Sequence, residues 1–212
     1  MRQFPLQKRR VHIAERYGEQ PYRREHAIEL AREMGNRTIL LADFSEVVSV
    51  SAPFMHSLLK TIRNDRKQGY FNDSLLALVN TNEDIRFTTG VINRLLYIVS
   101  AVGNAQNLEF VPSPEEPQAE LLSLTQSFTK DSGAYSIGDL MSSLNITQKS
   151  SQLRLYPLIW GGVVARAKLK KLSDDHGSAY GGLYLHRTIS VEDLAEDSTH
   201  DSLAEPDEDL QS

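Results

Sequence analysis

Short apolar runs and helical patterns alternate along the first half of the chain. Runs that are apolar and rich in strand-forming residues occur at Thr38–Asp43, Ser74–Val79 and, more weakly, Asn107–Val111. Apolar residues at helical spacing occupy the segments between and before these runs: Arg23–Met34, Pro53–Gln68 and Asn82–Val102. A further strand is expected around Val11–Ile13. Such alternation predicts an α/β fold, in which helices pack on a small sheet.

The second half of the chain predicts helices first and strands last. Helical spacing occurs in three segments, Ala119–Lys130, Ser136–Leu144 and Gln148–Trp160. Asn145-Ile146-Thr147 forms a tight turn before the third helix, and Thr147 is suited to cap that helix. Pro157 lies inside the third helix, where proline removes a backbone hydrogen bond, so we expect a kink. Gly161-Gly162 ends the helix, and the two extended segments that follow predict a β-hairpin: Val163–Arg166 and Gly182–Arg187.

Two breaks in this pattern divide the chain. Three prolines within Pro112–Pro117 can continue neither a helix nor a central strand, so we expect a linker there. After Ser190 the apolar periodicity stops, and Glu192–Asp209 holds nine acidic residues and no lysine or arginine. Such a segment has too few large apolar side chains to offset its ordering entropy. The predicted organisation is an α/β domain at 1–111, a linker at 112–118, a second domain at 119–190 and a disordered acidic tail at 191–212.

Composition excludes several classes of protein. The 212 residues include no cysteine, which excludes disulfides, thiolate catalysis and cysteine-based metal sites. The N-terminus lacks the apolar stretch of a signal peptide, and the longest apolar run, Leu95–Val102, is far shorter than the roughly twenty residues of a transmembrane helix. We therefore expect a cytoplasmic protein with no membrane partner. The net charge of −5 is uneven, because residues 125–190 carry eight basic and four acidic residues.

The motifs of the first domain follow a definite order. Pro21-Tyr-Arg-Arg-Glu-His-Ala27 is an arginine-rich helix start, and Ile39-Leu-Leu-Ala-Asp-Phe-Ser-Glu-Val47 is a strand that ends in Asp-Phe-x-x-Val. Ser49-Val-Ser-Ala-Pro-Phe54 is a small-residue turn that opens a helix, and Leu78-Val-Asn-Thr-Asn-Glu-Asp-Ile85 forms the next strand-to-helix junction. Over roughly residues 10–111 this pattern resembles the STAS-like family found beside GHKL-type ATPases. The resemblance implies a small sheet flanked by helices that binds other proteins instead of turning over a substrate.

One turn departs from the STAS-class antagonists of sigma factors, which carry Asp-Ser-Ser-Gly with a serine that accepts phosphate. The aligned turn is Ser51-Ala52-Pro53-Phe54, so the phosphoacceptor position is Ala52, which has no hydroxyl. The resemblance therefore implies a partner-binding site without a phosphate switch, formed by Ser51, Pro53, Phe54 and Ser57. The alternative for the two serines is the common role of a cap or turn residue at a helix start.

Apolar spacing in the second domain runs from Tyr135-Ser-Ile-Gly-Asp-Leu140 through Ile146-Thr-Gln148 to Leu158-Ile-Trp-Gly-Gly-Val-Val164. With the predicted hairpin as its wing, this domain resembles a winged helix–turn–helix domain. The resemblance implies DNA binding, with the start of the second motif helix in the major groove and the wing approach on the flanking backbone. The candidate DNA-binding residues are Gln148, Lys149, Ser151, Gln152, Arg154, Lys168, Lys170 and Lys171. Glutamine can bridge adenine and arginine can bridge guanine, whereas lysine meets phosphates.

No catalytic constellation stands out, so we expect neither an enzyme nor a cofactor. The six histidines are scattered and never fall at a two-ligand helical spacing, which argues against a metal site. No glycine-rich phosphate loop occurs. An enzyme acting at the Ser51–Phe54 turn is the remaining catalytic alternative.

These patterns predict a two-domain regulator that binds double-stranded DNA and contacts a protein partner or ligand through its STAS-like domain. The alternative is a protein-only adaptor or scaffold in a multiprotein assembly, with a GHKL-type ATPase as one candidate member. The sequence leaves a homodimer open. It also leaves two roles for the acidic tail, which could compete with DNA for the basic domain or serve solubility alone.

Overall fold

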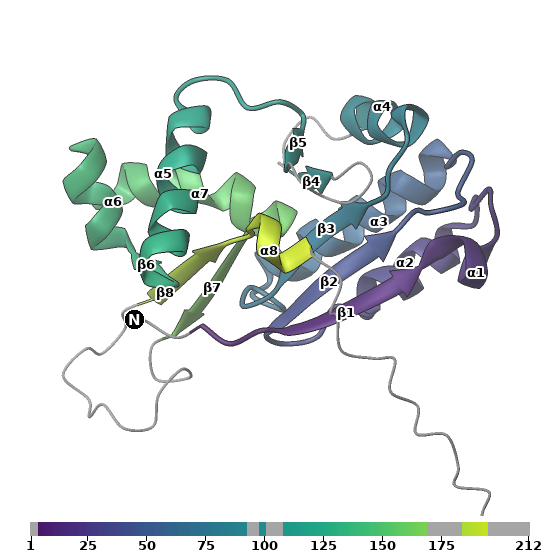
Figure 1. The fold of residues 1–212 in the computed structure, drawn as a ribbon, viewed down its shortest axis with the longest axis horizontal. Helices are drawn as coiled ribbons and strands as arrows, with labels where there is room; N and C mark the ends of the chain where they lie inside the picture. Colours follow the sequence, from purple (N-terminus) through teal and green to yellow (C-terminus); the bar gives the residue numbers. More distant parts are fainter. Residues whose placement is uncertain (1–3, 93–97, 101–107, 169–183, 195–212) are drawn as a thin grey trace, which may run out of the picture.

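A five-stranded sheet forms the centre of the fold (Figure 1). The computed structural model describes residues 4–92, 98–100, 108–168 and 184–194. The strands lie side by side in chain order: β1 (Gln7–His12), β2 (Thr38–Asp43), β3 (Leu75–Val79), β4 (Ile98–Ser100) and β5 (Glu109–Val111). The first four are parallel, and β5 runs antiparallel to β4.

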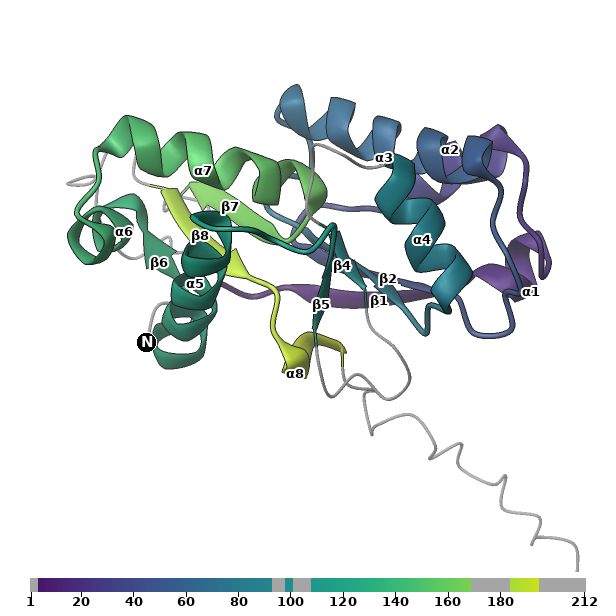
Figure 2. The ribbon, with the colours of Figure 1, turned by 90° about the horizontal axis from the view of Figure 1, so that it is seen from above.

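The helices that connect the parallel strands lie on one face of this sheet. They are α1 (Ile13–Tyr17), α2 (Arg24–Arg32), α3 (Ala52–Lys67) and α4 (Glu83–Ile92). Crossovers between parallel strands are right-handed, so strands in sequential order place their crossover helices on the same side. Figure 2 shows α2, α3 and α4 together above the sheet. The opposite face is left for the second half of the chain to cover.

The central strands of the sheet are buried on both faces, which explains their continuous apolar sequence. Every residue of β2 and β3 is buried. Successive side chains of a strand point to opposite faces. Leu40 and Leu76 accordingly join the core formed with α2 and α3, whereas Leu41 and Ala77 join the core formed with the C-terminal elements.

The second half of the chain forms three helices, a short three-stranded antiparallel sheet and a final helical turn. In chain order these are α5 (Gln118–Ser132), β6 (Tyr135–Ser136), α6 (Ile137–Leu144), α7 (Gln148–Gly161), β7 (Val164–Lys168), β8 (Tyr184–Thr188) and α8 (Val191–Leu194). The strand order is β6-β8-β7. The structure is thus a mixed α/β protein whose C-terminal elements share a core with the sheet.

A buried arginine and a glycine join the two halves of the fold. Arg66, in the last turn of α3, is 1% exposed and donates from its two terminal nitrogens to the carbonyls of Ile159 and Ser74, each at 2.7 Å. The Ile159 carbonyl belongs to the last turn of α7, where carbonyls lack the usual helical partner four residues on, and it also accepts the Gly162 backbone N–H at 3.1 Å. Beyond α7, the Gly162 carbonyl accepts a hydrogen bond from the Leu76 backbone N–H at 2.9 Å. The end of α7 is therefore fixed to both α3 and β3.

Most of the predicted elements are confirmed, but three expectations are wrong. The helix predicted over Asn82–Val102 ends at Ile92, and Ile98–Ser100 form a strand instead. Tyr135–Ser136 form the unpredicted strand β6. The tail predicted to be disordered begins with the ordered turn α8, in which Leu194 is 2% exposed and Asp193 binds Arg187 at 2.5 Å. Residues 195–212 lie outside the described residues.

Candidate functional site

The start of α7 is shaped by local capping. Asn145 adopts a left-handed conformation (φ 49°) that ends α6, and asparagine tolerates that conformation better than most residues. Two residues later, the Thr147 hydroxyl accepts the Ser150 backbone N–H at 3.3 Å and caps α7, as its position in the sequence predicts. The two helices are therefore joined by a three-residue turn, and α7 begins at Gln148 with its first turn at the surface.

Most of the described DNA-binding candidates reach the surface. Gln148, Lys149 and Lys168 are exposed, and the side chains of Gln152 and Arg154 are half-buried. These five residues come from the first two turns of α7 and the end of β7. Lys170 and Lys171 lie outside the described residues.

Ser151 was predicted to be exposed, and that prediction is wrong. Its exposed fraction is 0%, and its hydroxyl donates to the Thr147 carbonyl at 3.1 Å. Ser151 lies one turn before Leu155, which is also buried, so both face the interior of the fold. The residue supports the helix start and cannot reach a ligand outside the protein.

The basic groups near α7 are available for an anion. Among the described residues, Lys149, Arg154 and Lys168 form no ion pair. The acidic residue closest in sequence to Lys149, Asp139, is committed to the α6 capping box, where it accepts from the Ser136 backbone N–H at 2.7 Å. The start of α7 and the end of β7 thus present two glutamine amides and three cations that form no ion pair within the described part of the chain.

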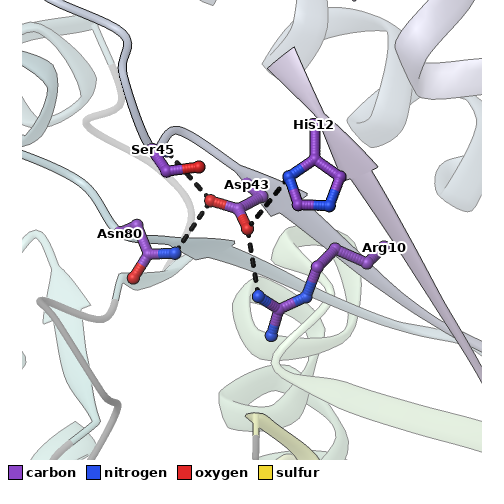
Figure 3. Close-up of polar contacts among 5 residues, drawn as sticks. All are labelled: Arg10, His12, Asp43, Ser45 and Asn80. Carbon is purple, nitrogen blue, oxygen red and sulfur yellow. Dashed lines mark hydrogen bonds and ion pairs between the residues drawn. The ribbon is translucent and has the colours of Figure 1, made fainter. Parts of the chain in front are cut away.

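A second polar cluster lies where the parallel strands end (Figure 3). Asp43, the last residue of β2, is 1% exposed and sits between side chains from the neighbouring strands. One of its oxygens accepts from the Ser45 backbone N–H at 2.9 Å and from the Asn80 amide at 2.8 Å. The other accepts from Arg10 at 3.0 Å and lies 3.5 Å from the His12 ring nitrogen Nδ1. The carboxyl ends of β1, β2 and β3 are tied together through this one carboxylate.

The Asp43 carboxylate is held in its charged form. Burial raises its pKa, but the hydrogen bonds from Ser45 and Asn80 and the Arg10 charge outweigh burial, so its pKa falls below the ordinary value. Both carboxylate oxygens already accept hydrogen bonds from protein donors, so we assign Asp43 a role in positioning the neighbouring segments. It fixes the loop that follows β2, and the Asn82 amide fixes the same loop by donating to the carbonyls of Val47 and Val48, each at 2.9 Å.

Asp43 belongs to the Asp-Phe-x-x-Val motif, but it was not predicted to be a site residue. The sequence does contain a signal for this cluster: the acidic Asp43 ends one apolar strand segment, and Asn80 directly follows the next apolar strand segment. The carboxyl ends of adjacent parallel strands meet at one edge of a sheet, which brings the two together. The contribution of Arg10 and His12 required the pairing of β1 with β2, and β1 was only weakly predicted.

The predicted partner-binding residues do not form one exposed surface. Phe54 is 0% exposed and belongs to the core under α3, so its predicted contact with a partner is wrong. The Ser51 hydroxyl accepts the Phe54 backbone N–H at 3.2 Å and donates to the Tyr22 carbonyl at 3.2 Å, which confirms the alternative of a helix cap. Pro53 is exposed and Ser57 is half-buried.

Exposed apolar side chains occur instead on α4, in the loop after β2 and just before α2. Phe87 and Val91, four residues apart on α4, are 71% and 54% exposed. Val48, in the loop held by Asp43 and Asn82, is 55% exposed, and Tyr22 is 63% exposed. Neighbouring exposed apolar side chains, such as Phe87 and Val91 on α4, are found at protein contact surfaces.

Comparisons of the chain with protein families, curated proteins and solved structures find no match. None of the helices within the described residues has the length and apolar character needed to cross a bilayer. In the same part of the chain, no three acidic or histidine side chains gather as a metal site would require.

Proposed function

We propose that this protein is a DNA-binding regulator whose C-terminal elements act as a winged helix–turn–helix domain and whose sheet acts as a STAS-like unit that contacts a protein partner. Helix α7 is the recognition helix, and the β7–β8 hairpin is the wing. The helix–turn–helix order, the three-residue turn and the strand order β6-β8-β7 support this assignment.

The observation that carries the proposal is the surface at the start of α7. A helix with a sharply capped start presents Gln148, Lys149, Gln152 and Arg154, beside Lys168 at the end of β7. Lysine and arginine without acidic partners neutralise phosphates, and glutamine and arginine have the donor and acceptor geometry for base edges. The far end of α7 is fixed to α3 and β3, so the helix is presented as a rigid element.

The test is the salt dependence of DNA binding by the full chain. Each phosphate contact contributes about 0.9 to the slope of log affinity against log salt concentration. Replacing Lys149, Arg154 and Lys168 by alanine should therefore reduce that slope by up to about 2.7 and weaken binding at low salt.

A matched control removes the same charge elsewhere. Arg24, Arg32 and Lys60 are exposed on α2 and α3, and their triple alanine variant carries the same net charge as the first. It should retain the slope and affinity of the unmodified chain. Equal losses of slope and affinity in both triple variants would show that the effect comes from net charge alone. The proposal would be rejected if the unmodified chain did not bind DNA at low salt.

A protein-only adaptor is the second candidate, and the exposed apolar residues of α4 favour it. Replacing Phe87 and Val91 by serine should remove a partner captured by chemical cross-linking in the native host. A GHKL-type ATPase is one expected partner. If the adaptor function is correct, this double variant abolishes cross-linking while the unmodified chain binds no DNA. If the regulator function is correct, the same variant retains DNA binding.

A further inference from the structure

A pocket of about 160 Å³ lies between α7 and the β7–β8 hairpin. Its polar and aromatic lining comes from Gln148, Gln152 and Tyr156 on α7 and from Arg166, Tyr184 and His186 on the hairpin. A cavity of roughly 150 Å³ in another protein holds a benzene molecule, so this pocket has room for a single aromatic ring.

The strand register brings the polar groups of the hairpin together. Arg166 on β7 is paired directly with His186 on β8, so their side chains share one face of the sheet. Tyr184 lies two residues before His186 and therefore shares that face. The Arg166 guanidinium lies 4.8 Å from the centre of the Tyr184 ring.

Two buried polar atoms in this group have no hydrogen-bond partner among the described residues. They are Nε of Arg166 and Nδ1 of His186. His186 is 2% exposed, and burial and the Arg166 charge lower its pKa to about 3, so the ring is neutral at physiological pH. The ring also hydrogen-bonds with the Tyr135 backbone. With that bond made through Nε2, Nδ1 retains a lone pair and requires a donor.

The two unpartnered atoms indicate which ligand groups would form hydrogen bonds with them. Arg166 offers a charged donor, and His186, its direct partner across the two strands, offers an acceptor; both residues line the pocket. None of the described lining residues is acidic, so among the described residues the Arg166 charge has no acidic partner in the pocket. Unsatisfied buried polar groups are rare in native proteins and call for a partner.

We propose that this pocket binds a single-ring aromatic carboxylate that carries a hydrogen-bond donor. The carboxylate pairs with Arg166, the donor meets Nδ1 of His186, and the ring packs against Tyr156 and Tyr184. The two glutamines close the outer end of the pocket.

Ligand binding would also regulate DNA binding, a consequence that rests on the proposed function. Gln148 and Gln152 both line the pocket and belong to the surface assigned to DNA. A ligand that engages their amides removes them from base contacts, so the occupied protein should bind DNA more weakly.

The test is calorimetric titration of the full chain, without DNA, with three probes. The probes are 3-hydroxybenzoate, benzoate, which lacks the donor, and 3-hydroxybenzamide, which lacks the charge. We expect 3-hydroxybenzoate to bind most tightly, with an affinity about tenfold higher than that of either other compound. No binding of any probe, or equal binding of all three, would overturn the proposal.

Two variants locate the binding. Arg166→Gln should weaken 3-hydroxybenzoate binding by about tenfold or more, whereas Arg32→Gln, at an exposed position on α2, should leave it unchanged. Equal affinities in the two variants would contradict the pocket. The probe series uses the unmodified chain, so it decides the proposal even if Arg166→Gln does not fold. A chain that binds the probe but no DNA would refute the DNA-binding function alone and leave the pocket standing.

Discussion

Replacing Gly162 by alanine tests the junction between α7 and the sheet. Gly162 has a φ of +83°, which strains any residue with a side chain by about 1–2 kcal/mol. A Cβ at this position would also lie 2.7 Å from Cβ and 3.2 Å from the backbone nitrogen of Leu76 in β3. Because Leu76 belongs to the fully buried strand β3, neither atom can move away easily. Overpacking of this kind costs about 1–3 kcal/mol more.

Gly69 provides the matched control. It also has a positive φ, of +94°, but a Cβ there would meet no atom within 4 Å. Gly69→Ala should therefore be destabilised by backbone strain alone, whereas Gly162→Ala should be destabilised by both backbone strain and overpacking against Leu76. The two variants should differ by about 1–3 kcal/mol in the free energy of unfolding, and a chain of this size loses about 2–4 °C of melting temperature per kcal/mol.

The assay is urea unfolding of the full chain, followed by circular dichroism and by Trp160 fluorescence. Trp160 lies in the last turn of α7, with the Lys67 ammonium 4.7 Å from the centre of its ring, so its fluorescence reports on the junction itself. Both signals should change together in one transition, because the two halves share a core. Equal destabilisation by the two alanine variants would show that α7 does not end against β3, and the rigid presentation of the helix would lose its basis.

Three further predictions follow from other parts of the molecule. The pKa of His186 is lower in the folded than in the unfolded state, so the free energy of unfolding should fall as pH drops from about 6.5 towards 3, by up to about 1.4 kcal/mol per pH unit. In melting curves recorded over this pH range, His186→Gln should show a weaker pH dependence. A chain ending at Ser190 should have a free energy of unfolding about 2 kcal/mol lower than one ending at Leu194, because it loses a buried leucine. Comparing the DNA affinity of the full chain with that of the chain ending at Leu194 then isolates the effect of the tail. Tighter binding after truncation would indicate that the tail competes with DNA, and equal affinities would indicate a role in solubility alone. Mass spectrometry of protein from its native host should find no stoichiometric phosphate on Ser51 or Ser57, because the position that the STAS resemblance assigns to the phosphoacceptor is an alanine and the Ser51 hydroxyl is engaged as a cap.

Sequence patterns predicted elements well wherever local signals and tertiary burial agree. The run Thr38–Asp43 was assigned with the bounds of β2, because a fully buried strand is apolar at every position. The bounds of α7 were also predicted, because the Thr147 cap at its start and the two glycines after Trp160 at its end are local signals. Where a strand is short and its partners are distant in sequence, as for Ile98–Ser100, apolar periodicity alone favoured helix and was wrong.

The sites were harder to predict than the elements, because they depend on contacts between distant residues. The Asp43 cluster needs three strands in register, and the pairing of Arg166 with His186 needs the hairpin. Ser151 was assigned to a surface from its place at the start of the second motif helix, and Phe54 from the turn that resembles the STAS family, but helix geometry turns both inward. A sequence states which residues are present on a helix, whereas the face that each residue occupies follows from what packs against it.

The most direct measurement of the central claim is site-specific cross-linking to DNA. The chain has no cysteine, so a single cysteine can carry a photo-activated cross-linker at one chosen position. Lys149→Cys places the probe on the first turn of α7, and Lys60→Cys places it on the exposed side of α3. At a salt concentration where the full chain binds duplex DNA, the probe at position 149 should cross-link to DNA and the probe at position 60 should not. Equal cross-linking from both positions, or cross-linking from position 60 alone, would contradict the assignment of α7 as the DNA-reading helix.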